Sequence, residues 1–273
     1  MNEDEKQTEP VGREAMPFVA PCRELRPFAP LGWLRLGFRD LGQAPQPSLL
    51  YGFFMAFIMA TVVWLAWTRG SQYIMIAMLG GFVFIAPLAC VGLYAISAQL
   101  ERGQQPSISR SLRAAFKRHI GNQLIFGIVL LIIFMVWSRA ALMITVFFPV
   151  DANPGFQSLI PYLTIGTSVG AFFAIVTFSA SAFALPMIMH RDVDCITAIV
   201  TSINAVLRNK FAMMFWLALI MFGLVLGFMT AFVGLIIILP VIGYGAWHGY
   251  LETIDAEQFP RHSAGITSIP RQP

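Results

Sequence analysis

Residues 210–252 read KFAMMFWLALIMFGLVLGFMTAFVGLIIILPVIGYGAWHGYLE. Between Lys210 and Glu252, 41 consecutive residues include no Asp, Glu, Lys or Arg. A helix of that length would extend about 60 Å, roughly twice the hydrocarbon thickness of a bilayer. The stretch therefore predicts two membrane-spanning helices joined by a turn near 229–234, with one crossing as the alternative.

The remainder of the chain has the same character. Of its 273 residues 57% are hydrophobic and only 12% are charged, whereas a soluble domain carries about 25% charged residues. Apolar runs at about 49–67, 73–98, 123–148 and 160–189 are each long enough to cross a bilayer. We therefore predict an all-α polytopic membrane protein with six spans, and five spans as the alternative.

The basic residues indicate an orientation. Sixteen of the eighteen Lys and Arg fall in four segments that six spans would place on one side. Such segments are cytoplasmic under the positive-inside rule. We expect a disordered cytoplasmic N-terminal tail over 1–30, a six-helix membrane domain over 31–251 and a short cytoplasmic C-terminal tail over 252–273. The four basic segments are 1–47, 99–119, 190–210 and 251–273.

Three amphipathic segments precede apolar runs, at 31–41, 106–120 and 194–210. Amphipathic helices with basic residues lie in the membrane interface. We expect these segments to be interfacial helices on the cytoplasmic side, each followed by a helical hairpin. In the first of them, four apolar residues share one helical face: Leu31, Leu34, Phe38 and Leu41.

Arg139 lies within the third predicted span, in FMVWSRAALMI. A cation in the hydrocarbon costs roughly 3 kcal/mol on insertion scales, so such residues are often functional. No acidic residue lies at a similar depth to pair with it. We therefore favour a structural arginine that binds free carbonyls or extends to the headgroups, with an anion, proton or lipid contact as the alternative.

The fourth span ends in LPMIMHRDVDC, residues 185–195. His190, Arg191, Asp192 and Asp194 form a polar cluster that could be a metal or proton site. A hinge explains the cluster without further ligands, because Asp194 precedes an amphipathic run and can accept the free N–H groups of its first turn. We therefore predict that Asp194 caps a surface helix and that Asp192 pairs with Arg191 or with an arginine of a neighbouring inner segment, such as Arg110 or Arg113.

Two further groups of residues are candidates. Trp247 and His248 lie near the end of the last apolar run, and His248 shares a predicted depth with His119 and His190. Because metal ligands usually show a recognisable spacing, we expect no metal and no cofactor. Small residues four apart suit close helix packing, within the bundle or with a partner: Gly166 and Gly170, Gly223 and Gly227, Gly245 and Gly249.

Four stretches together resemble the DUF2189 family of bacterial predicted integral membrane proteins. They are DLGQAPQPSLLYG, IAPLACVGLYAISAQLERGQQPS, LPMIMHRDVDCITAIVTS and LPVIGYGAWHGY. The resemblance covers about 32–251. It implies a helical-hairpin bundle in a bacterial inner membrane, and it implies no activity.

The sequence contains no nucleophile elbow, no zinc-protease motif and no phosphate loop. We therefore expect a protein that is not an enzyme: a scaffold or accessory protein that binds membrane lipids, other membrane proteins or itself, and no nucleic acid. The alternative is a transporter or channel for a small apolar or anionic solute. Arg139, the proline-interrupted helices and a hydroxyl-rich fourth span favour it, since interrupted helices often form midplane sites.

Overall fold

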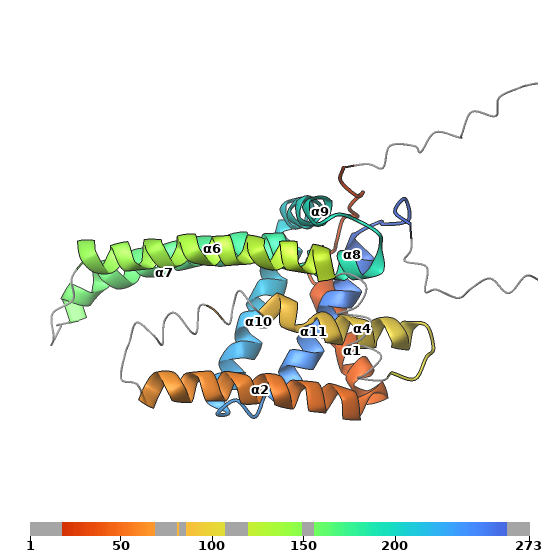
Figure 1. Cartoon of the computed structure of the whole chain (residues 1–273), viewed down its shortest axis with the longest axis horizontal. Helices are drawn as coiled ribbons and strands as arrows, with labels where there is room; N and C mark the ends of the chain where they lie inside the picture. The colour runs from red at the N-terminus through yellow and green to blue at the C-terminus, as the bar shows by residue number, and fades with distance from the viewer. Residues whose placement is uncertain (1–17, 69–80, 82–85, 107–119, 149–155, 261–273) are drawn as a thin grey trace, which may run out of the picture.

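The computed structural model describes residues 18–68, 81, 86–106, 120–148 and 156–260, and these residues are helical apart from short connections (Figure 1). The predicted all-α class is therefore confirmed. The helices are α1 (Ala29–Gln43), α2 (Pro45–Thr68), α4 (Val91–Glu101), α6 (Ile120–Phe147), α7 (Phe156–Ser181), α8 (Ala184–His190), α9 (Cys195–Arg208), α10 (Lys210–Met229) and α11 (Leu235–Thr253).

Among the described residues, five helical stretches are long and apolar enough to cross a membrane. They agree with five of the six predicted spans. The other predicted span, 73–98, is described only in part, at residue 81 and over 86–98, and its end forms the start of α4. The five candidate spans are Pro45–Leu65, Gly121–Phe147, Leu159–His190, Lys210–Met229 and Leu235–Thr253.

The long apolar block is divided into α10 and α11 by a turn at 230–234, where the sequence predicts one. The turn contains neither Pro nor Asn. Ala231 and Phe232 adopt positive φ angles of 49° and 69°, and the Thr230 hydroxyl accepts the Gly234 N–H at 2.9 Å. A threonine that closes the turn therefore replaces the usual turn residues.

Helix α11 is the centre of the bundle, with α1, α2, α4 and α10 packed around it. Trp33 of α1 is fully buried there, edge-on to Trp216 of α10 and to Phe183. Two glycines allow α1 and α2 to lie close to α11. A Cβ on Gly37 of α1 would lie 2.5 Å from the Val241 carbonyl oxygen, and a Cβ on Gly52 of α2 would collide with the Ile236 carbonyl. The backbones of α1 and α2 therefore approach α11 more closely than any side chain would allow.

The fourth predicted span is interrupted between α7 and α8. The Ser202 hydroxyl of α9 donates to the Ser179 carbonyl at 2.8 Å and accepts the Phe183 N–H at 3.1 Å. These two backbone groups would bond to each other in a continuous helix. An inserted hydroxyl is a known cause of a helix break, so α9 fixes the point at which α7 ends.

Both terminal segments pack against this end of the molecule (Figure 1). Cys22 forms a β-bridge with Ile254, and the Asp255 N–H donates to the Pro21 carbonyl at 2.9 Å. Phe259 is buried. The described parts of the two predicted tails, 18–28 and 254–260, are therefore ordered segments that pair with each other on one side of the bundle.

The amphipathic helix α1 faces the bundle with a different set of residues from the apolar face seen in the sequence. Leu31 and Phe38 are 50% and 56% exposed. Pro30, Trp33, Gly37 and Asp40 are buried against the neighbouring helices. The apolar face is thus divided: Leu31 and Phe38 are directed outward, while Leu34 and Leu41 pack against the core. The buried side of α1 includes one aromatic ring, one glycine and one carboxylate.

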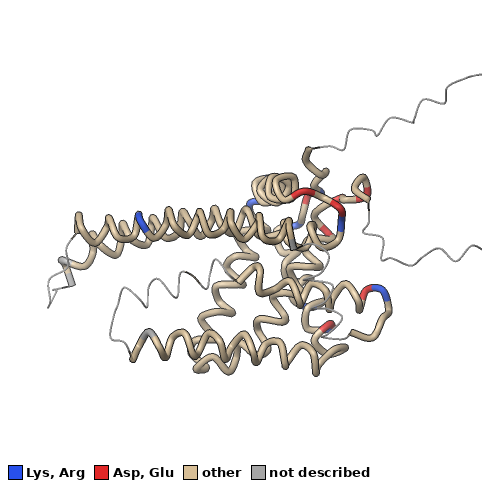
Figure 2. Tube along the Cα trace, viewed as in Figure 1, with Lys and Arg blue, Asp and Glu red and all other residues tan. Residues whose placement is uncertain are grey.

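The pair α6 and α7 extends away from the rest of the described chain (Figure 1). Figure 2 shows that most charged residues gather at the end where the described terminal segments lie, while the α6–α7 hairpin carries one basic residue, Arg139. Arg139 is exposed and forms no ion pair with any described residue. It precedes the end of α6 at Phe147 by eight residues, about 12 Å.

We expect Arg139→Leu to insert and to accumulate at least as well as the unsubstituted protein, because no described carboxylate loses a partner. The measurement is the yield of monodisperse protein after detergent extraction and size-exclusion chromatography. Arg139→Lys is the matched control. If Arg139→Lys accumulates and Arg139→Leu does not, then the positive charge is required for folding.

Candidate functional site

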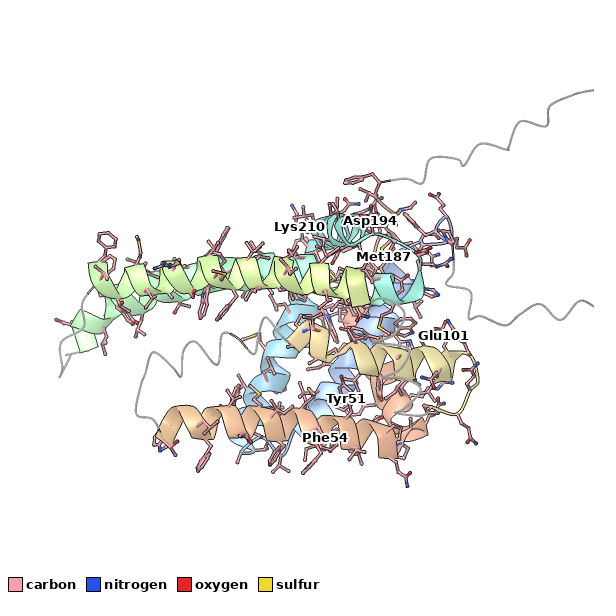
Figure 3. All side chains as sticks on the ribbon, in the orientation of Figure 1. Tyr51, Phe54, Glu101, Met187, Asp194 and Lys210 are labelled. Atoms are coloured by element: carbon pink, nitrogen blue, oxygen red, sulfur yellow. The ribbon has the colours of Figure 1, made fainter. Side chains whose placement is uncertain are left out.

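A polar pocket of about 320 Å³ opens at the charged end of the bundle. Its walls come from the ends of α4, α8 and α11, together with the two terminal segments. Figure 3 labels Glu101 at the end of α4 and Met187 on the neighbouring α8. The charged or aromatic residues that line the pocket are Arg23, Glu101, Arg102, His190, Arg191, Trp247, Tyr250, Asp255 and Glu257.

Arg191 is the buried cation of this pocket and is only 6% exposed. It follows directly after α8 and donates from Nη1 to the Phe259 carbonyl at 2.8 Å. Its Nε is buried without a hydrogen-bond partner among the described residues. The neighbouring Asp192 N–H donates to the Pro260 carbonyl at 3.0 Å, so the C-terminal segment is held against the hinge.

The predicted ion pair of Asp192 with Arg191 is not formed. Asp192 is exposed, and none of the ion pairs between described residues includes it. The guanidinium of Arg191 donates to the backbone carbonyl of Phe259 instead of pairing with Asp192. The other predicted partners, Arg110 and Arg113, lie outside the described residues.

His190 stands among aromatic side chains of α11. Its Nδ1 lies 3.0 Å from the Tyr250 hydroxyl, and its ring packs edge-on against Trp247 and Tyr250. The Trp247 indole N–H donates to a Glu101 carboxylate oxygen at 3.3 Å. Two of the sequence candidates, His190 and Trp247, therefore share one wall of the pocket with Glu101.

Asp194 is the N-cap of α9, and its Oδ2 accepts the Thr197 N–H at 2.9 Å. Partial burial acts to raise the pKa of this carboxyl, but hydrogen bonds from the Thr197 amide and hydroxyl outweigh it and bring the pKa below its ordinary value. The ionised cap is thus favoured by folding. Its contribution to stability is complete above the ordinary carboxylate pKa of about 4 and is lost as pH falls through the lower folded value.

We expect Asp194→Ala to lower the free energy of unfolding by about 1 kcal/mol at neutral pH, because the first turn of α9 loses its cap. Asp194→Asn keeps a capping oxygen and should stay within a few tenths of a kcal/mol of the unsubstituted protein. The measurement is the midpoint of SDS-induced unfolding, followed by tryptophan fluorescence. Equal loss in both variants would show that the charge, rather than the cap, stabilises the helix.

His248 lies apart from His190 and belongs to a second polar cluster. Its Nε2 is 2.8 Å from Oδ2 of Asp40, a buried carboxylate of α1. Ser97 of α4 donates to the same Oδ2. This cluster joins α1, α4 and α11, and the described part of the chain contains no group of three or more residues arranged to hold a metal ion.

The glycine pairs occupy three environments. Gly245 and Gly249 face Trp216 and Trp33, which a Cβ would approach to 2.9 Å. Gly223 and Gly227 face Ile238 and Leu235 of α11, so both pairs serve packing within the bundle. By contrast, a Cβ on Gly166 or Gly170 of α7 would meet nothing within 4 Å.

Several residues of these clusters have little signal in the sequence. Asp40 lies in a basic amphipathic segment, where a carboxylate is ordinarily an exposed residue. The spacing of Asp40 from Trp33 and Gly37 places the three residues on one helical face. This spacing is the feature of the sequence that indicates burial of Asp40. Arg23, Asp255 and Glu257 come from expected tails, and nothing in their local sequence indicates that they reach a pocket.

Residues 74–190 match the model of the family described as "Predicted integral membrane protein (DUF2189)". No curated protein and no solved structure matches the chain. The matched segment includes α4, α6, α7 and α8, while α1, α2, α9, α10 and α11 lie outside it. The pocket thus combines residues from both parts. The apolar helices and this match show that the chain is an integral membrane protein, whose residues 74–190 are similar to the DUF2189 family.

Proposed function

We propose that the protein is a non-enzymatic accessory protein that binds membrane lipids at its charged end. The observation that carries the proposal is the orientation of α9. Its small and hydroxyl residues, among them Thr201 and Ser202, face the bundle, whereas Ile196 and Leu207 are 61% and 57% exposed. Phe211 continues this outward surface at the start of α10 and is 80% exposed.

This arrangement has a physical explanation in a membrane. The hydroxyl face of α9 is used inside the protein, where Thr201 accepts the Ala20 N–H and Ser202 bonds at the break before α8. The aliphatic face then needs an apolar environment. Arg208 and Lys210 lie beside it at the end of the helix, as in helices that lie at the headgroup boundary with cations toward anionic lipids.

The test places a fluorescent label on α9. Cys22 and Cys195 are buried, and burial raises the pKa of both thiols, that of Cys195 to about 11. Thiolates are the reactive species, and the third cysteine, Cys90, is only partly buried. A new cysteine at Leu207→Cys in a Cys90→Ser chain should therefore be labelled selectively, with the Cys90→Ser chain as background. In lipid nanodiscs we expect quenching by lipids that carry a quencher near the headgroup.

Glu24→Cys is the matched control, since Glu24 is exposed and pairs with Arg208. A label there should be quenched by aqueous iodide more strongly than the label at position 207 and by the lipid quencher less strongly, because Glu24 lies on the polar side of α9. Quenching of the label at position 207 by iodide alone would contradict the proposal. It would leave α9 as a surface for a protein partner, which pull-down from mild detergent would then identify.

A second candidate function is transport, and one observation favours it. An apolar pocket of about 190 Å³ lies between α4, α7, α10 and α11, with Thr177 and Ser181 in its wall. Three further hydroxyl residues of the fourth span, Thr164, Thr167 and Ser168, are exposed on α7, and Ser179 is buried. A stoichiometric apolar solute found by mass spectrometry in purified protein would favour transport over the accessory role.

We further propose that the protein resides in a bacterial inner membrane with both termini cytoplasmic. The pairing of the two terminal segments supports an even number of crossings, and the positive-inside bias supports the orientation. We expect a fluorescent reporter fused after Pro273 to be active in the cytoplasm. Activity of alkaline phosphatase at the same fusion point would contradict this topology.

A further inference from the structure

We propose that the polar pocket at the charged end binds a phosphodiester that also carries an ammonium group, such as the headgroup of phosphatidylethanolamine. The inference rests on the proposed lipid-binding function and names the class of lipid. It starts from the environment of Arg191. A buried guanidinium requires a charged or hydrogen-bonding partner, and the only partner among the described residues is one backbone carbonyl, that of Phe259.

The missing partner should be an oxyanion. None of the carboxylates of the pocket lies within ion-pair distance of Arg191 in the described structure. Asp255 is instead paired with Arg23 at 3.6 Å, and Glu101 accepts the Trp247 indole N–H. A phosphate oxygen suits the planar guanidinium, which binds phosphates through paired N–H groups.

The carboxylates define the other half of the ligand. Glu101, Asp255 and Glu257 balance the three arginines of the pocket in number. A ligand with negative charge alone would bind the guanidinium of Arg191 but would be repelled by these carboxylates. A ligand with both charges satisfies each group, which favours a zwitterionic phosphodiester over free phosphate or an anionic lipid.

The position of the pocket suits a headgroup. Two candidate spans, Leu159–His190 and Leu235–Thr253, end beside it, and His190 and Tyr250 line its wall. The ends of membrane spans lie at the depth of the lipid headgroups. With a volume of about 320 Å³, the pocket has the size of a small-molecule site.

The experiment is calorimetric titration of the full-length protein in detergent. The probes are the soluble headgroup glycerophosphoethanolamine, its anionic counterpart glycerophosphoglycerol, inorganic phosphate and short-chain phosphatidylethanolamine. We expect the ethanolamine compounds to bind at one site per chain. Binding of both identifies the headgroup as sufficient, whereas binding of the lipid alone identifies a membrane lipid as the ligand.

Arg191→Gln removes the charge and keeps a neutral amide donor on a shorter side chain, so we expect it to weaken ethanolamine binding at least about tenfold. Arg208→Gln is the matched control and should bind normally, because Arg208 lies outside the pocket and pairs with Glu24. Glu257→Lys tests the other charge without disturbing a buried side chain, since Glu257 is exposed. It should weaken the ethanolamine probes and strengthen glycerophosphoglycerol.

Equal binding of glycerophosphoglycerol and glycerophosphoethanolamine, unchanged by Glu257→Lys, would overturn the proposal, as would the absence of binding for every probe. The label at position 207 reports the lipid contact of α9 independently. If that label meets lipid while the pocket binds nothing, then the headgroup site is wrong and the proposed function stands. If the label at position 207 does not meet lipid and the pocket binds no probe, then the headgroup site and the proposed function are both wrong.

Discussion

Gly37→Ala should destabilise the protein by about 3 kcal/mol or more, the upper part of the range for overpacked cores. A Cβ at this position of α1 would lie 2.5 Å from the Val241 carbonyl oxygen and 3.3 Å from the Gly245 nitrogen. Both atoms belong to the backbone of α11, so no side-chain rotation relieves the contact. The two helices would have to separate, and Trp33 would lose its packing on Gly249.

The matched control is Gly42→Ala on the same helix, where a Cβ meets nothing within 4 Å. Alanine has the higher helix propensity, by roughly 1 kcal/mol, so this variant should be as stable as the unsubstituted protein or more so. The measurement is again SDS-induced unfolding of both variants. Equal stability of the two would mean that α1 and α11 do not approach as closely as the structure has them.

The sequence predicts the membrane helices well because hydrocarbon imposes a strong constraint. A bilayer requires about 20 apolar residues for each crossing and internal hydrogen bonds for the backbone. The division of 210–252 into two helices follows from this length alone, although its turn uses Thr230, Ala231 and Phe232 and contains neither Pro nor Asn. Helix existence is therefore predictable even where the local turn chemistry is not.

The partners of polar residues are harder to predict, because they depend on which helices meet. The N-cap of α9 is a local feature, and Asp194 shows it in the sequence. The break before α8 depends on Ser202, which is 19 residues from Phe183 in the chain. The pocket depends on Arg23 and Glu257, which are brought together by the pairing of the two terminal segments. No local pattern contains that information.

The aliphatic faces of α1 and α9 illustrate the same limit. Periodicity identifies an apolar face, but in a membrane protein that face can be directed to lipid while small and polar residues pack inside. Leu31 and Phe38 of α1 and Ile196 of α9 are exposed. The buried sides contain Gly37, Ser202 and their neighbours, whose small size allows close helix contacts. The spacing of apolar residues therefore does not reveal which side of such a helix packs against the protein.

Asp40→Ala is expected to lower the free energy of unfolding by about 3 kcal/mol, since it leaves the buried partners of a carboxylate without an acceptor. His248 lies 2.8 Å from Asp40 Oδ2, and Ser97 donates to the same oxygen. Each partner comes from a different helix, α11 and α4 respectively. The loss should therefore loosen α1 from both neighbours, unlike a substitution at an exposed residue of the same helix.

Two further variants separate the causes. Asp40→Asn keeps an oxygen acceptor in the same place and should cost about 1 kcal/mol, the value of a typical hydrogen bond. In the double variant Asp40→Ala with His248→Ala, the second substitution removes the group that the first leaves unpaired. The free energy of unfolding that the double variant loses should be smaller than the sum of the losses in the two single variants by about 1 kcal/mol or more. Strictly additive losses would show that Asp40 and His248 do not interact in the membrane, and would assign the role of Asp40 to Ser97 alone.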